Sequence, residues 1–315
     1  MNQDEIINIR LLSDWSKCNY KCSYCIVSEQ QEAFVSWSED NYKKIINNLT
    51  LASFRYNIRL GVQGEFFVNK VLIEGGRSLS NSKNCFGVNL ITNLSLSIAQ
   101  FDKAFEGYDL KKVGLVASYH PTEIKDIDAW IETAVYMNGK VDFSLIVVAY
   151  PPILTSLSHM VKKFHELGMH VAVQAYIGDY QGKSYPAAYT PEEKQLIKSM
   201  VYSRHDYEFL VNLKKPGMCY AGSKSFFVNT LNGIVKTCGI PHMKDAKIIG
   251  NLLESPNIQF LSAPMKCTSP SCQCDTENIN TVIFHKHYNR VGVNQHKFEY
   301  NDNDIEKLTQ WEIAY

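Results

Sequence analysis

The sequence lacks an excess of either charge, a long apolar run and a basic amino-terminal segment. Lysine plus arginine and aspartate plus glutamate both number 32, so no net field attracts the chain to nucleic acid. No run of about 18 apolar residues is present that could cross a bilayer. Residues 1–12 do not have the basic and apolar regions of a signal peptide. We therefore expect a soluble, cytoplasmic protein without nucleic-acid or membrane partners.

Cysteine, by contrast, is abundant and clustered. Of the 9 cysteines, all but Cys85 fall into three groups: Cys18, Cys22 and Cys25, then Cys219 and Cys238, then Cys267, Cys272 and Cys274. In a reducing compartment, clustered cysteines are more often metal ligands or redox groups than disulfides. Cys85 is interpreted as a small buried hydrophobic residue.

Strand-like and helix-like segments alternate from residue 5 to about residue 178. Strands are predicted where apolar residues run on, and helices where they form one stripe. The strands are 6–12, 56–62, 86–92, 112–119, 141–150 and 170–177, and the helices are 38–53, 97–107, 123–139 and 153–168. Six such units predict a parallel α/β sheet that forms a (βα)6 partial TIM barrel rather than a closed barrel. Its ligands should bind at the carboxyl ends of the strands.

The alternation stops after residue 178. A polar loop leads to a helix capped near Thr190, and a hairpin over residues 225–238 is predicted to turn at Asn232 and Gly233. From about residue 205 the chain is rich in loops and cysteines, so a bound metal would help it to fold. We therefore predict a barrel domain over residues 1–204 and a small cysteine-rich domain over residues 205–315.

Cys18, Cys22 and Cys25 follow the first predicted strand directly. Structural zinc usually takes four ligands, and no fourth cysteine is near in the sequence. Three thiolates instead suit an iron–sulfur cube whose fourth iron stays open for a substrate or cofactor. A zinc loop or a redox-thiol loop is the alternative.

The motif C-x3-C-x2-C after the first strand, with Tyr24 just before the last cysteine, resembles the signature of the radical S-adenosylmethionine (SAM) superfamily. The resemblance covers about residues 5–178. It implies a [4Fe–4S] cluster on Cys18, Cys22 and Cys25 with SAM on the open iron. It also implies that an electron from an external donor, such as flavodoxin or ferredoxin, cleaves SAM to methionine and a 5′-deoxyadenosyl radical. That radical would abstract a hydrogen atom from a C–H bond of the substrate.

The same resemblance implies contacts to SAM from the ends of the strands. The Gly-Gly-Glu motif of the family appears here as Gln63-Gly64-Glu65, with its first glycine lost. The implied cofactor-binding residues are Tyr24, Gly64, Glu65, Asn93, Ser118, His120 and Gln174. The alternatives are a helix-starting turn at Gly64 and Glu65, a turn histidine at His120, and core residues at Gln174 and Tyr176.

The second cysteine set, C-x13-G-x4-C from Cys219 through Gly233 to Cys238, resembles the opening of the SPASM domain and of its shortened form, Twitch. Five cysteines suffice for one cluster but not for two. The resemblance therefore implies a Twitch-like domain with one auxiliary [4Fe–4S] cluster, bound by Cys219, Cys238 and two of Cys267, Cys272 and Cys274. A zinc knuckle with four thiolates is the alternative.

The superfamily includes enzymes that modify ribosomal peptides and enzymes that act on sugars and aminocyclitols. Because Cys18 lies so near the start, we expect no leader-binding domain of the peptide-modifying kind. Tyr180, Tyr185 and Tyr189 are candidates for stacking on a sugar face. We therefore predict an oxidoreductase or epimerase for a carbohydrate or small polar metabolite. Radical modification of a peptide or protein side chain is one alternative, and a structural or electron-transfer protein with iron–sulfur or zinc is another.

Overall fold

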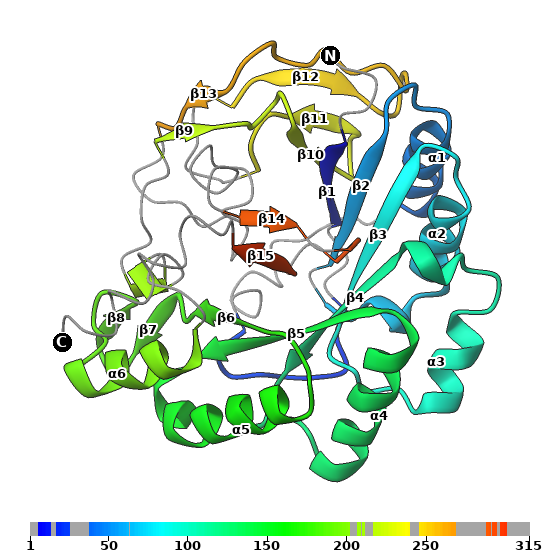
Figure 1. Ribbon diagram of the computed structural model, residues 1–315. Coiled ribbons are helices and arrows are strands. Elements are labelled where there is room, and N and C mark those ends of the chain that lie inside the picture. The colour runs from blue at the N-terminus through cyan, green and yellow to red at the C-terminus, as the bar shows by residue number, and fades with distance from the viewer. Residues whose placement is uncertain are drawn as a thin grey trace.

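The computed structural model describes residues 6–13, 17–25, 38–62, 64–201, 207–208, 210–211, 217–239, 246–268, 288–290, 292–294 and 297–300. Its main feature is one sheet of nine strands in the order β12-β11-β10-β1-β2-β3-β4-β5-β6, curved into an open arc (Figure 1). Six parallel strands form the barrel part: β1 (Ile7–Ser13), β2 (Tyr56–Val62), β3 (Cys85–Thr92), β4 (Val113–Tyr119), β5 (Asp142–Ala149) and β6 (Val171–Ala175). The predicted partial barrel is confirmed.

Helices follow the strands in the βα order and cover the outside of the arc (Figure 1). They are α1 (Glu39–Thr50), α2 (Lys70–Ser80), α3 (Ile98–Ala104), α4 (Ile127–Lys140), α5 (Leu154–Glu166) and α6 (Pro191–Met200). Short 3-10 helices lie at Phe66–Val68, Leu110–Lys112 and Pro151–Ile153. The start of α6 confirms the predicted cap, because Thr190 and Glu193 form a reciprocal capping box.

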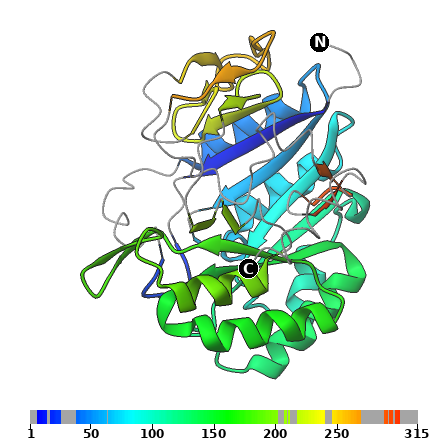
Figure 2. The ribbon, with the colours of Figure 1, turned by 60° about the vertical axis from the view of Figure 1, so that its left-hand side comes forward.

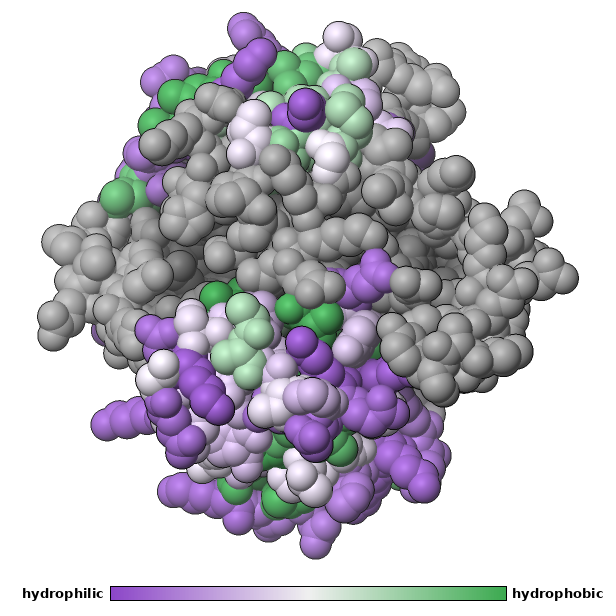
Figure 3. Space-filling model, turned by 90° about the vertical axis from the view of Figure 1, so that its left-hand side faces the viewer, coloured by the Kyte–Doolittle hydropathy of each residue, from purple (hydrophilic) through white to green (hydrophobic). Residues whose placement is uncertain are grey.

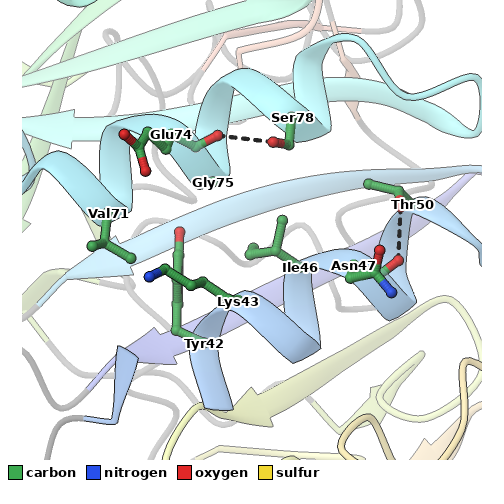
Figure 4. A pocket seen from close by; sticks show the side chains of 9 residues that line it. All are labelled: Tyr42, Lys43, Ile46, Asn47, Thr50, Val71, Glu74, Gly75 and Ser78. Carbon is green, nitrogen blue, oxygen red and sulfur yellow. Dashed lines mark hydrogen bonds between the residues drawn. The ribbon is translucent and has the colours of Figure 1, made fainter. Parts of the chain in front are cut away.

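The α2 helix is an element that the sequence pattern did not reveal. Its interior contains Gly75 and Gly76, and glycine disfavours helix by about 1 kcal/mol relative to alanine. In the structure a Cβ on Gly75 would come within 2.6 Å of the Tyr42 ring of α1. Figure 4 shows Tyr42 reaching from α1 toward α2 across the groove between the two helices. Glycine at position 75 therefore allows the close packing of α2 on Tyr42.

The two faces of the sheet differ in polarity. Residues such as Ile9 of β1, Ile58 of β2 and Val88 of β3 are level with one another, fully buried and part of one core with the helices. The alternate residues face the inside of the arc and include Arg10, which pairs in register with Arg59. An outer apolar face and a partly polar inner face follow from the two-residue period of a strand.

Three further strands extend the sheet past β1 (Figure 2). They are β10 (Ser225–Asn229), β11 (Ile234–Lys236) and β12 (Ile248–Asn251). β10 and β11 form the predicted hairpin, with Gly233 at a φ of +69°. The sequence did not predict that β10 would pair with β1 in parallel, with Ser225 opposite Asn8. The domain boundary near residue 204 stays a prediction.

Short strand pairs and loops complete the described structure. β7 (Gly178–Tyr180) pairs with β8 (Lys183–Tyr185), β9 (Met218–Cys219) with β13 (Met265–Lys266), and β14 (Tyr288–Arg290) with β15 (Phe298–Tyr300). Hydrophilic side chains cover the lower part of the face where α5 and α6 lie (Figure 3). In the described ranges, no helix is both long and apolar enough to span a bilayer.

Residues 292–294 cover the amino-terminal ends of β3, β4 and β5. The Asp142 carboxylate accepts the backbone N–H groups of Val293 and Asn294 at 2.8 and 2.7 Å. Lys297 Nζ lies 2.8 Å from the other carboxylate oxygen. A Cβ on Gly114 would come within 3.0 Å of Asn294 Cα. The carboxylate, the lysine and the small glycine together hold this segment against the sheet.

The Asn294 side chain is the most deeply buried part of this contact, with no exposed surface. Its Nδ2 donates to the carbonyls of Leu115 and Asp142 at 3.2 and 2.9 Å, and its Oδ1 accepts from Ser144 Oγ at 3.2 Å. The amide therefore forms hydrogen bonds with polar groups of both β4 and β5.

We predict that Asn294→Ala lowers the free energy of unfolding by about 3 kcal/mol, because it removes three hydrogen bonds of a fully buried amide. The urea midpoint at constant m value measures this change. Asn138→Ala on α4 is the matched control and should leave the midpoint almost unchanged. Equal midpoints for wild type and Asn294→Ala would contradict the anchoring role.

Candidate functional site

The loop of residues 17–25 follows β1 at the carboxyl end of the sheet and contains the first three cysteines. Cys18 is exposed, Cys22 is buried and Cys25 is half-buried. Burial, together with the negative charges of Glu123, Cys25 and Cys18, raises the pKa of Cys22 to about 12. The thiols are thus close enough to influence one another, and a thiolate at Cys22 would need a cation beside it.

The end of β2 holds this loop at Lys17. Glu65 donates its backbone N–H to the Lys17 carbonyl at 3.0 Å. Gly64 has a φ of +122°, and a Cβ there would overlap the same carbonyl. Only glycine combines this backbone conformation with so close an approach. Gln63, the other member of the predicted motif, lies outside the described residues.

The Glu65 side chain joins the ends of β2 and β3. Its Oε1 accepts from Phe67 N–H at 3.1 Å and from Thr92 Oγ1 at 2.8 Å. Its Oε2 accepts from Asn93 N–H at 2.6 Å. Burial raises the pKa of Glu65 to about 7, against the opposing effect of these hydrogen bonds. Both carboxylate oxygens therefore accept hydrogen bonds from within the protein. Glu65 also caps the short helix Phe66–Val68, as expected of the helix-starting turn that is the alternative interpretation of Gly64 and Glu65.

The end of β3 holds the loop at Cys18 and Asn19. Asn93 Nδ2 donates to Asn19 Oδ1 at 2.7 Å and lies 3.8 Å from Cys18 Sγ. Asn19 in turn donates to Ser95 Oγ at 2.7 Å. The carbonyl of Asn93 accepts from Trp130 Nε1 of α4 at 3.0 Å. Asn93 is therefore anchored by its backbone while its amide contacts the cysteine loop.

The end of β4 holds the second half of the loop. His120 Nδ1 shares a hydrogen bond with Tyr24 Oη at 3.1 Å, and Glu123 Oε2 accepts the Lys21 N–H at 3.0 Å. Burial lowers the pKa of His120 to about 4, so the ring is neutral near pH 7. Because α4 begins at Ile127, Glu123 lies in a turn and not in the helix predicted from residue 123.

Ser118 lies on β4 and Gln174 on β6. Both are half-buried, and both alternate with residues of the main core, so they face the inside of the arc. Val116, Ile146 and Ala172 form a small apolar cluster on the same face. The inner face thus has an apolar layer with polar side chains nearer the carboxyl ends of the strands.

Tyr150, which the sequence analysis did not select, extends the aromatic contacts of the loop to the end of β5. Its ring centroid lies 4.8 Å from that of Tyr24, 5.0 Å from Tyr176 and 5.5 Å from Tyr180. Its position as the last residue of the fifth predicted strand, 141–150, was the available signal, since residues at strand ends meet at one edge of the sheet.

The prediction that Tyr185 and Tyr189 stack on a sugar is wrong. They are 7% and 3% exposed and pack into the main core. The Tyr189 hydroxyl donates to the Ala149 carbonyl at 2.6 Å and accepts the Tyr176 N–H at 3.0 Å. These tyrosines therefore fix the segment after β6 against β5. Tyr180 is half-buried beside Tyr150.

The described cysteines of the carboxyl-terminal part gather at a second place. Cys219 of β9 pairs with Met265 of β13, and Cys267 donates its N–H to the Gly217 carbonyl at 2.7 Å. Cys238 and Cys267 are each 7% exposed and belong to one small cluster. The pKa of Cys219 is raised to about 11, mainly by burial and further by the nearby Cys238 and Cys267, whereas a hydrogen bond from the Ala221 backbone lowers it. Cys272 and Cys274 lie outside the described residues.

The chemistry of both sets fits iron–sulfur clusters. Among the described residues, no three His, Cys, Asp or Glu side chains are arranged to hold a single metal ion. In a [4Fe–4S] cube each thiolate binds a different iron, so its ligands are spread around the cube. Cys18, Cys22 and Cys25 would hold one such cluster, and Cys219, Cys238 and Cys267 would supply three ligands of another. Their roles as ligands stay predictions.

We predict that Gly64→Ala pushes Lys17, and with it the cysteine loop, away from the end of β2, because the added Cβ would overlap the Lys17 carbonyl. Iron content after anaerobic reconstitution should then fall by about half, which is the share of one of two [4Fe–4S] clusters. Gly168→Ala is the matched control. Gly168 also has a positive φ, of +72°, but no atom lies within 4 Å of an added Cβ. Equal iron loss in both variants would attribute the effect to backbone strain alone and contradict the role of the Lys17 contact.

Comparisons with known proteins bear on the fold. No protein-family model and no curated protein matches the sequence. Among solved structures, native anSMEcpe with bound AdoMet and Kp18Cys peptide aligns with a TM-score of 0.54 at 18% identity, over 79% of each chain. Native anSMEcpe with bound AdoMet alone aligns with a TM-score of 0.53 at 18% identity, also over 79% of each chain. BtrN in complex with AdoMet and 2-DOIA has a TM-score of 0.43 at 16% identity, over 80% of each chain. The likeness to anSMEcpe shows that this chain has the fold of a protein that binds AdoMet, the fold that the resemblance to the radical SAM superfamily predicted.

Proposed function

We propose that the protein is a radical SAM enzyme. The observation that carries the proposal is the loop of Cys18, Cys22 and Cys25, held at the carboxyl ends of β1 to β4 in the fold of anSMEcpe, whose structures contain AdoMet. When bound, the cluster and SAM supply a 5′-deoxyadenosyl radical that removes a hydrogen atom from an unactivated C–H bond. An external donor such as flavodoxin or ferredoxin supplies the electron.

The chain's own residues would fix the geometry of this chemistry. Tyr24, Gly64, Glu65, Asn93, Ser118, His120 and Gln174 are the proposed cofactor-binding set. Three of them contact the cysteine loop: Gly64 lies against the Lys17 carbonyl, Asn93 donates to Asn19, and His120 shares a hydrogen bond with Tyr24. Because both oxygens of Glu65 accept hydrogen bonds within the protein, we propose that its carboxylate fixes the ends of β2 and β3 and that backbone groups beside it meet SAM.

The second cysteine set is proposed to bind one auxiliary [4Fe–4S] cluster. Support comes from the proximity of Cys219, Cys238 and Cys267. This proximity favours Cys267 as the third ligand, with either Cys272 or Cys274 as the fourth. Such a cluster would accept an electron from a substrate radical or hold the substrate.

The proposed substrate is a carbohydrate or small polar metabolite, which the enzyme oxidises or epimerises. Support comes from the partly polar inner face of the arc, where Arg10 is in register with Arg59. Radical modification of a peptide or protein side chain is the second candidate. It is favoured by the structure of anSMEcpe that contains the Kp18Cys peptide.

We predict that Cys18→Ala abolishes the formation of 5′-deoxyadenosine from SAM and dithionite, because one iron loses its thiolate. Cys219→Ala should retain cleavage without substrate, provided that its circular dichroism spectrum is native. Cys85→Ala, which changes neither set, is the control and should keep wild-type iron content. Cleavage that persists in Cys18→Ala would contradict the radical SAM assignment, and zinc in place of auxiliary iron in wild type would contradict the second cluster.

The substrate proposal predicts transfer of a specific hydrogen. A perdeuterated sugar or aminocyclitol that is a substrate should accelerate SAM cleavage and deliver deuterium to 5′-deoxyadenosine, as mass spectrometry can measure. Genes adjacent to this one guide the choice of compounds, since glycosyltransferases or aminotransferases favour a sugar and a short precursor gene favours a peptide. Deuterium transfer from a peptide, with none from the small molecules, would establish the second candidate instead.

A further inference from the structure

We infer that Glu123 holds the three-cysteine loop at Lys21 and lowers the reduction potential of the cluster bound by Cys18, Cys22 and Cys25. The inference rests on the proposed function, because it requires that cluster. It makes Glu123 a positioning residue, which acts on the cluster without binding it.

The contact is direct and close to a ligand. Glu123 Oε2 accepts the backbone N–H of Lys21, the residue before Cys22, at 3.0 Å. The turn that presents Glu123 is itself fixed, since the N–H groups of Glu123 and Ile124 both donate to the His120 carbonyl at 3.0 and 3.2 Å. His120 contacts Tyr24 on the same loop. The turn after β4 therefore forms hydrogen bonds with the loop on both sides of Cys22, at Lys21 and at Tyr24.

The charge of Glu123 acts on the cysteine loop. Its Oε2 lies 3.0 Å from the backbone nitrogen of Lys21, one residue from Cys22, so a negative charge on Glu123 lies close to that ligand. In the part of the chain that the structure describes, no lysine or arginine forms an ion pair with Glu123. The carboxylate is therefore a negative charge beside the loop that no described lysine or arginine pairs with directly.

The charge of this carboxylate lowers the potential of a nearby cluster. The potential of a [4Fe–4S] cluster depends on local charge, hydrogen bonds to sulfur and solvent exposure. Reduction adds negative charge, which a neighbouring carboxylate opposes by Coulomb repulsion. A lower potential makes the reduced site a stronger donor toward a sulfonium.

Three variants of the full-length, reconstituted protein separate charge from positioning. Glu123→Gln removes the charge and keeps an oxygen that can accept the Lys21 N–H. Glu123→Asp keeps the charge but is one methylene shorter, so it withdraws from Lys21. Glu132→Gln changes an exposed glutamate of α4 and is the control. Iron per chain and the midpoint potential, from a redox titration followed by electron paramagnetic resonance, are measured for each. The Cys18→Ala variant identifies the auxiliary signal.

We expect the midpoint potential to become less negative in Glu123→Gln, to rise less in Glu123→Asp and to stay unchanged in Glu132→Gln. An unchanged potential in Glu123→Gln with full iron content would overturn the inference. If Glu123→Gln fails to retain iron, the potential of Glu123→Asp decides, and an unchanged value there overturns the inference as well. Absence of this cluster from wild type would instead reject the proposed function.

Discussion

The site depends on a constraint of parallel sheets, which is that all strands of the barrel end at one edge. The cysteine loop has no regular secondary structure of its own, and contacts from neighbouring strand ends fix it. Glu65 N–H holds Lys17, Asn93 holds Asn19, and Glu123 holds Lys21. These contacts exist only because β1 to β4 are in register, so the packing of the outer apolar face determines where the thiols lie.

The same sheet is closed at its opposite end by a distant part of the chain. Asp142 and Asn294 join the start of β5 to residues 292–294, which lie at the amino-terminal ends of the strands. A carboxylate that accepts two backbone N–H groups and faces Lys297 is a strong anchor, because charge-assisted hydrogen bonds exceed neutral ones in strength. This end is therefore occupied by structural contacts, and the candidate chemistry lies at the other end.

The sequence predicted the features that depend on local pattern. Six apolar strands, the α6 cap at Thr190 and the hairpin at Gly233 follow from periodicity and turn chemistry. The pairing of β10 with β1, the seat of Asn294 and the burial of Tyr189 depend on contacts between residues far apart in sequence, which no local pattern encodes. The α2 helix was missed for a different reason, since Gly75 opposes helix locally and is explained only by the Tyr42 ring against it.

The pairing of β10 with β1 also explains why the two cysteine sets are separate. Ser225 at the start of β10 is level with Asn8, and β11 runs back antiparallel, so Cys238 lies toward the amino-terminal end of β1. Cys18 follows the carboxyl end of that same strand. The charges that act on Cys18 come from Glu65 and Cys25, whereas those that act on Cys219 come from Cys238 and Cys267. Among the described cysteines, Cys219, Cys238 and Cys267 are therefore not placed to supply a fourth thiolate to the first set, which agrees with the proposal that one iron of that cluster binds SAM.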